Sequence, residues 1–345
     1  MQQYSNKFGF DVMSGFYFKN RHVRDKYQAL SKANGADESS ADWIEWLECG
    51  NLLRANYPYA RSIMAASFAS PIVSILEHIN IYYHACGHSL TGKTALLRFA
   101  MSIWGDPEQI TFQYYATKAG LRDCAKMMDP LPLALDQVEF MIGKKKQLSA
   151  WVDMLTNPVS TPEMVATLAS GQATIPARSE YRNQNIISTG EVAITDIAPD
   201  QKGNPSLLEV KADPLPRTGE ARDALDSMKL GHYVWLTANS GYDGRTGLAG
   251  IAGQKFLTFL KHLPADNPNS SAGHETSRSI IVQALNSMIR TMKDELDVSF
   301  SARLDNASVL AVADYYASQS VFGVEDEKKA WSEAVELGKK IIAAE

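Results

Sequence analysis

The apolar residues of the first two hundred positions recur at two spacings, which predicts helices that alternate with short strands. From residue 59 to 77 the apolar side chains follow a helical period, with Pro71 as an expected break or kink. The next segment, 79–86, is short, β-branched and aromatic, and this composition predicts a buried strand. A glycine-bounded loop then leads into a helix predicted over 93–104.

Two further apolar segments, 131–135 and 185–188, predict two more buried strands. Residues 148–168, which lie between them, carry helical periodicity. Strands that alternate with helices in this way predict an α/β fold with a central parallel sheet. The segment 196–220 contains four prolines and is predicted to be rich in loops. Helical patterns then follow at 256–263, 279–296, 309–318 and 324–344.

The same pattern divides the chain into three predicted parts. Residues 1–57 form an N-terminal extension, polar at first and ending in a helix around Trp43. Residues 58–250 form the α/β core, and residues 251–345 form a helical C-terminal region.

Composition and charge narrow the class of protein. A net charge of −5 excludes a globally basic nucleic-acid wrapper, so any contact with DNA or RNA needs a local basic patch. The three cysteines, Cys49, Cys86 and Cys124, are too few and too scattered for a disulfide framework or a zinc site. They are typical of a reduced compartment, and neither a signal peptide nor a clean apolar span of about 20 residues is visible. We therefore expect a cytoplasmic protein with no membrane contact.

The segment 87–94 matches the phosphate-binding loop (P-loop, or Walker A) pattern G-x-x-x-x-G-K-[ST], between the predicted strand and helix. Its glycines let backbone N–H groups point at phosphate oxygens. Lys93 supplies a positive charge to the phosphates, and the Thr94 hydroxyl is a ligand for Mg²⁺. We predict that ATP is bound by Gly87, His88, Ser89, Leu90, Thr91, Gly92, Lys93, Thr94 and Ala95.

Asp136, directly after the strand 131–135, is the candidate second Mg²⁺ ligand, although a carboxylate at this position is also a common turn residue. A P-loop ATPase with an extra strand between the two motifs usually places Glu after this Asp, but here the next residue is Gln137. If the strand continues, Glu139 lies on the same face as Gln137. Three alternatives stay open: slow hydrolysis with Gln137, hydrolysis with Glu139 as base, or nucleotide binding without turnover.

Other polar residues are candidates for sensing phosphate or binding a polynucleotide. Thr189, after the third strand, is placed to sense the γ-phosphate, or it simply caps the next turn. Arg178 and Arg182 precede that strand, and Arg303 precedes an apolar helix, so each is a candidate sensor arginine or trans arginine; a solvated arginine is the alternative for all three. The basic run 144–146 is either a solvated face or a nucleic-acid contact.

These motifs resemble a family of helicase-like P-loop ATPases encoded by bacteriophages, prophages and mobile genetic elements, often fused to or beside primases and long catalogued as a domain of unknown function. The resemblance covers roughly residues 58 to 320. It is carried by the segments 87–97, 102–105, 133–136, 168–171 with Arg178, and 187–191.

The resemblance implies an AAA+-like or RecA-like core, a ring-shaped homo-oligomer and translocation on single-stranded or duplex DNA. It implies that Lys93, Thr94, Asp136 and Thr189 bind ATP and Mg²⁺. Gln137 stands where the family has Glu, and this difference puts the ability to hydrolyse ATP in doubt. A primase or another replication protein is an implied partner.

The leading hypothesis is a Mg²⁺–ATP-dependent motor ATPase, helicase-like, acting in phage or mobile-element DNA replication. The alternative is an ATP-binding switch or assembly subunit with little or no hydrolysis. A P-loop kinase is a third possibility, disfavoured because the sequence shows scattered arginines rather than an arginine-rich lid.

Overall fold

The computed structural model describes the greater part of the 345-residue chain. The described residues are 9–11, 15–17, 41–76, 79–89, 91–105, 107–114, 117–128, 130–156, 185–214, 219–220, 223, 250–263, 277–299 and 301–344. All structural statements below concern these residues.

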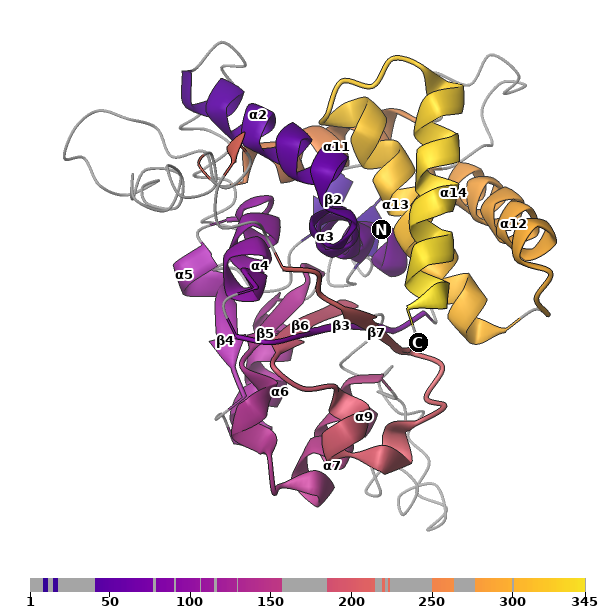
Figure 1. Ribbon diagram of the computed structural model, residues 1–345. Helices are drawn as coiled ribbons and strands as arrows, with labels where there is room; N and C mark the ends of the chain where they lie inside the picture. The colour runs from indigo at the N-terminus through magenta and orange to yellow at the C-terminus, as the bar shows by residue number, and fades with distance from the viewer. Residues whose placement is uncertain are drawn as a thin grey trace, which may run out of the picture.

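Five parallel strands form the central sheet, in the order β4-β5-β6-β3-β7 (Figure 1). Their bounds are β3 Ile81–Cys86, β4 Thr111–Gln113, β5 Leu133–Asp136, β6 Asn185–Gly190 and β7 Leu207–Lys211. The predicted α/β class, the parallel sheet and the three predicted strands are confirmed. Residues of β3, β5 and β6 are almost all buried, because helices cover both faces of the sheet.

Four strands and several short elements were not predicted. The strand β7 lies inside the segment 196–220, where only loops were expected, and β4 is a three-residue edge strand. A separate two-stranded antiparallel sheet is formed by β1 Gly9–Asp11 and β2 Gly15–Tyr17. The remaining short elements are α5 Pro107–Ile110, η2 Val138–Met141, α9 Ile194–Ile197 and η3 Pro199–Gln201.

Helices form a layer on each side of the sheet (Figure 1). Helices α3 Pro58–Leu76 and α4 Lys93–Ser102 pack on one face, against β3, β5 and β6. Helices α6 Lys118–Met128 and α7 Lys145–Thr156 contact the other face. Outside α3 lie α2 Ala41–Asn56, α11 Ile251–His262, α12 Ser277–Leu296, α13 Ala302–Ser320 and α14 Glu327–Ala343. The four helices predicted for the C-terminal region are confirmed.

Helix α3 is the central packing element, because the sheet covers one side of it and α13 covers the other. Every residue of α3 except Pro58 and Arg61 is buried. Among the described helices it is the one long and apolar enough to cross a membrane, and 94% of its most apolar window is buried inside the protein. The predicted break at Pro71 is wrong, since one helix runs through it. Burial on both sides outweighs the roughly 3 kcal/mol that an interior proline costs a helix.

Aromatic side chains join the N-terminal helices to the C-terminal ones. Trp46 of α2 stacks on Phe99 of α4 with ring centroids 5.0 Å apart, and on Phe322 after α13 at 6.0 Å. Phe68 of α3 packs against Phe256 of α11 at 4.9 Å. These contacts belong to one hydrophobic cluster that extends from α2 to α14.

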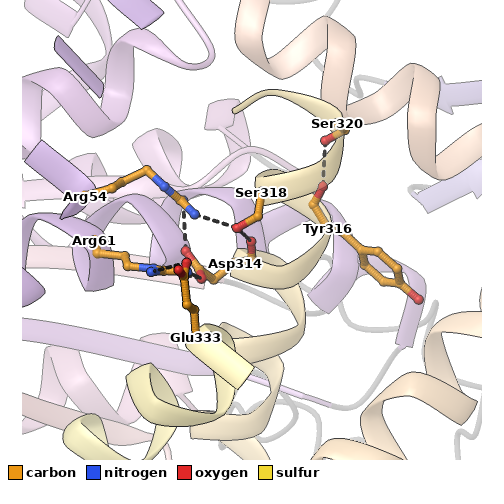
Figure 2. A network of polar contacts seen from close by, with 7 residues as sticks. All are labelled: Arg54, Arg61, Asp314, Tyr316, Ser318, Ser320 and Glu333. Atoms are coloured by element: carbon orange, nitrogen blue, oxygen red, sulfur yellow. Dashed lines mark hydrogen bonds and ion pairs between the residues drawn. The ribbon is translucent and has the colours of Figure 1, made fainter. Parts of the chain in front are cut away.

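Charged side chains tie the same helices together beside this cluster (Figure 2). The carboxylate of Asp314, fully buried on α13, forms an ion pair with Arg54 of α2 at 2.8 Å and accepts a hydrogen bond from Arg61 of α3 at 2.6 Å. Arg54 also donates to Ser318 at 2.6 Å, and Arg61 donates to Glu333 of α14 at 2.9 Å. Burial lowers the pKa of Arg54 to about 10, against the opposing effect of Asp314. One buried carboxylate thus pairs with arginines from two helices, and Glu333 supplies a second negative charge.

Candidate functional site

The segment between β3 and α4 forms a tight loop at the carboxyl edge of the sheet. Gly92 has a φ of 86°, a left-handed conformation that glycine adopts without strain, and Lys93 begins α4 directly after it. The backbone N–H of Gly87 donates to the carbonyl of Gly190 at 3.2 Å, which attaches the loop to the end of β6. The strand, loop and helix predicted around the motif are therefore present; Leu90 lies outside the described residues.

The ammonium group of Lys93 lies inside this loop. Its Nζ donates to the carbonyl oxygens of Gly87 and His88, both at 2.7 Å, and to Thr91 Oγ1 at 3.0 Å. Burial lowers the pKa of Lys93, while the carboxylates of Glu191, Glu139 and Asp136 oppose this shift. The loop thus holds a buried cation, and the charges of three carboxylates act on it.

Asp136 and Thr189 meet where two neighbouring strands end. Asp136 is the last residue of β5 and is buried, and the Thr189 hydroxyl on β6 donates to its Oδ1. The backbone N–H of Gln137 donates to the same oxygen at 3.0 Å. Two donors therefore fix this carboxylate in one orientation, on the edge of the sheet where the loop lies.

The strand ends at Asp136, so the condition under which Glu139 would lie on the same face as Gln137 is not met. Gln137 has a φ of 68°, and η2 begins at Val138, so alternation of side chains does not place Glu139. A left-handed glutamine is strained by on the order of 1 to 3 kcal/mol, and such strain concentrates at functional sites. The turn instead brings Glu139 Oε2 to the backbone N–H of Glu191, at 3.2 Å.

Gly190 makes this approach possible. A Cβ atom at Gly190 would collide with Val138 Cγ1, so the first residue of η2 packs directly on the end of β6. Glu139 and Glu191 consequently lie side by side next to the loop.

Glu191 ends the segment 187–191 that carries the resemblance, but it was not predicted as a site residue. Its Oε1 accepts a hydrogen bond from the Ser89 hydroxyl of the loop, and its charge is the largest influence that opposes the lowered pKa of Lys93. The available signal was its place as the first charged residue after β6.

His84, also missed as a site residue, lies on β3 below the loop and is fully buried. Its ring nitrogens contact Ser188 Oγ at 2.6 Å and the Val192 carbonyl at 2.9 Å. Because a carbonyl only accepts, Nε2 carries the hydrogen and Nδ1 accepts from the serine. Burial lowers the pKa of His84, and Glu209 opposes this. The neutral imidazole therefore anchors the turn that carries Glu191.

A cleft of about 860 Å³ opens beside the loop. Gly87, His88, Thr91 and Glu191 line one part of it, and Arg303, in the first turn of α13, lines another. Arg303 Nη1 donates to the Leu207 carbonyl at 3.5 Å. The structure thus brings this predicted arginine to the same cleft as the loop.

The other predicted residues are placed as follows. Thr94 and Ala95 are half-buried in the first turn of α4. The lysines 144–146 are exposed around the start of α7. Arg178 and Arg182 lie outside the described residues.

Within the described ranges, no group of three or more His, Cys, Asp or Glu side chains is arranged to hold a metal ion. Mg²⁺ commonly binds through one or two protein oxygens together with substrate phosphates. The oriented Asp136 carboxylate and the Thr94 hydroxyl are donors of the type that Mg²⁺ prefers.

Comparisons with known proteins give a match to one family model and matches to solved structures. A family model described as a domain of unknown function (DUF927) matches residues 25–161. A solved structure named "SCCmec type IV Cch - active helicase" matches with a TM-score of 0.59 at 12% sequence identity, over 87% of this chain and 51% of that one. The chain thus spans about half the length of that neighbour, and the likeness is one of fold. No curated protein matches in sequence.

Proposed function

We propose that the chain is a Mg²⁺-dependent ATPase of the P-loop NTPase class, with a helicase-like role on DNA. The observation that carries this proposal is the buried Lys93 ammonium, held by carbonyl oxygens of a glycine loop between β3 and α4, at the edge of the sheet where Asp136 ends β5. A buried cation in a glycine loop at the start of a helix suits a polyphosphate.

The sheet supports the same class. The strand β6, which carries Thr189, lies between β3 with the loop and β5 with Asp136. This is the extra strand expected of the ATPase branch described above. The likeness to a structure named as a helicase, and the DUF927 match, agree with a helicase-like protein of a mobile element or phage.

The residues present fit ATP and Mg²⁺. The loop 87–95 would hold the phosphates, Thr94 and Asp136 would hold the metal ion, and the cleft lined by His88 and Arg303 has room for the rest of the nucleotide. When bound, Mg²⁺ neutralises phosphate charge and orients the phosphates for attack by water.

For proton transfer, the geometry favours Glu139 over Gln137. A glutamine amide accepts no proton, whereas the Glu139 carboxylate can take one from water. Its Oε2 is held by the Glu191 N–H, next to the Lys93 loop. We assign Glu139 as the general base and Thr189 as the group that orients Asp136 and senses the γ-phosphate.

The wider role is proposed from the resemblance and from the structural neighbour. A homo-oligomeric ring would let Arg178, Arg182 or Arg303 reach a nucleotide on an adjacent subunit. DNA and a primase or another replication protein are the proposed partners, in the cytoplasm and away from membranes.

Nucleotide binding and turnover test the proposal directly. Wild-type protein is expected to bind Mg²⁺–ATP in calorimetry and to release phosphate faster with single-stranded DNA. Lys93→Ala should weaken ATP binding about 10- to 100-fold, because charged hydrogen bonds to phosphate are lost. Lys118→Ala is the matched control, since Lys118 also begins a helix but is exposed. Absence of ATP binding by the wild type would refute the proposal.

An ATP-binding switch without turnover is the second candidate. The strained Gln137, at the position where the resembling family has Glu, favours it. Tight ATP binding with no phosphate release, with or without DNA, would establish the switch in place of the motor.

A further inference from the structure

Two large apolar side chains are exposed within three residues of each other, directly after the candidate site. Phe140 of η2 is 45% exposed and Ile142 is 60% exposed. In the part of the chain that the structure describes, Ile44 is the one other large hydrophobic residue with such exposure. Met141, between the two, is buried and fixes the segment to the protein.

Three lysines follow the two apolar side chains. Lys144, Lys145 and Lys146 are all exposed, around the start of α7. Lys145 lies 3.5 Å from Asp200, and both side chains are about half exposed, so solvent screens this pair strongly. The first turn of α7 holds no acidic residue, although the helix dipole favours acidic residues there. The lysines are therefore not placed to stabilise the helix.

We propose that this surface, Phe140, Ile142 and Lys144–Lys146, binds single-stranded nucleic acid. An exposed aromatic ring stacks on a base, an aliphatic side chain covers a base or sugar, and lysines pair with phosphates. Single strands offer unstacked bases and a charged backbone together, whereas a duplex hides its base faces. An acidic protein needs such a local patch to bind a polyanion.

The surface is joined to the site by one short turn. Phe140 follows Glu139 in η2, the Phe140 N–H donates to the Gln137 carbonyl at 3.2 Å, and the Ile142 N–H donates to the Glu139 carbonyl at 3.1 Å. A bound nucleic-acid strand that displaces Phe140 therefore also displaces the backbone that positions Glu139. This coupling rests on the proposed ATPase function, whereas binding to the surface does not require it.

Binding of a fluorescent dT oligonucleotide, measured by anisotropy, tests the proposal. Phe140→Ala should weaken binding by about 5- to 150-fold, as loss of one stacked base does. Phe140→Leu should recover little, because it restores apolar area without a ring. Ile44→Ala is the matched control, since Ile44 is also 45% exposed.

Charge is tested in the same assay. Replacing Lys144, Lys145 and Lys146 by Gln should reduce the slope of log affinity against log salt by about 2, the value for three phosphate contacts on a single strand. Lys328→Gln with Lys329→Gln is the control, because these two neighbouring lysines are also exposed at the start of a helix.

The outcomes separate this inference from the proposed function. Equal oligonucleotide binding by wild type and surface variants, or no binding by the wild type, would overturn the inference while ATP binding still decides the function. The inference would also be overturned if the protein bound duplex DNA more strongly than dT and Phe140→Ala left that binding unchanged. Binding to anionic vesicles in place of DNA would overturn it as well. Loss of DNA binding in the surface variants, with ATP binding intact, would support it.

Discussion

The Glu139 carboxylate accepts a hydrogen bond from the backbone N–H of Glu191. Replacing the carboxylate by an amide therefore tests its role as a base without removing this contact. Glu139→Gln keeps the size of the side chain and an oxygen that can accept from the Glu191 N–H. It removes the group that takes a proton, so phosphate release should fall by about 10²- to 10⁴-fold while ATP binding is retained. Steady-state phosphate release and calorimetry measure the two quantities.

Gln137 provides the comparison for this variant. Gln137→Ala keeps the backbone N–H that donates to Asp136, so we expect phosphate release to fall far less than in Glu139→Gln. A larger loss in Gln137→Ala would assign water activation to the glutamine instead.

Sequence reasoning predicted candidate site residues where a motif fixes a residue type. The G-x-x-x-x-G-K-[ST] pattern specifies Lys93, and a buried strand that ends in a carboxylate points to Asp136; the structure places both at one edge of the sheet. Glu191 and His84 belong to no such pattern. Their positions depend on Gly190, which lets η2 reach β6, and on a buried imidazole between two strands. Contacts of this kind arise from packing that one sequence does not display.

At the scale of elements, the ion pairs of Asp314 connect helices from opposite ends of the chain (Figure 2). Asp314→Ala would leave Arg54 and Arg61 with buried charge and no carboxylate between them. We expect it to lower the free energy of unfolding by about 3 to 5 kcal/mol. Urea denaturation followed by circular dichroism measures this change.

A substitution at Glu333 tests whether burial determines how much free energy of unfolding is lost. Glu333 binds the same Arg61, but its side chain is 36% exposed. Glu333→Gln should therefore cost about 1 kcal/mol or less. Similar losses in the two variants would contradict the assignment of Asp314 as the buried centre of the network.

The elements that were predicted are those with long or strongly apolar patterns. Helices α3, α12 and α13 have 19 or 20 residues each, and β3 and β6 are buried along their length. The strand β4 has three half-buried residues, so no alternation is visible in it. In β7 the apolar pair Leu207–Leu208 lies among prolines and charged residues, so the local composition does not indicate a strand. The segment is a strand because it pairs with β3.

Whole-molecule stability should depend on pH through His84. Its pKa in the folded protein lies below the ordinary 6.5, because burial, together with the Lys93 charge, outweighs the opposing effect of Glu209 and of the Val192 hydrogen bond. The unfolded chain therefore binds a proton first as pH falls below 6.5. Below pH 6.5 the free energy of unfolding should decrease by up to about 1.4 kcal/mol per pH unit. Above pH 6.5 the contribution of His84 to stability should be fully present.

Two variants isolate this effect. In His84→Gln the decrease between pH 6.5 and 5.5 should be smaller than in the wild type, whatever its absolute stability. His262→Gln removes an exposed imidazole at the end of α11 and is the control. An identical pH dependence in His84→Gln and wild type would show that other groups carry it.

The α/β class of the whole molecule followed from the sequence because strands and helices alternate at distinct periods. No local pattern shows the order of the strands, and the place of β6 between β3 and β5 was expected only from the ATPase branch that the motifs indicate. Likewise, no local pattern shows that α3 is covered by α13.

That last contact has a consequence for synthesis. Helix α3 ends at Leu76 and α13 begins at Ala302. More than two hundred residues must therefore be translated before α13 can pack on α3. At roughly 5 to 20 residues per second, the ribosome takes some tens of seconds or less to make them. During that interval the nascent chain carries its most apolar helix half uncovered, and we expect general chaperones to bind it there until the last helices emerge.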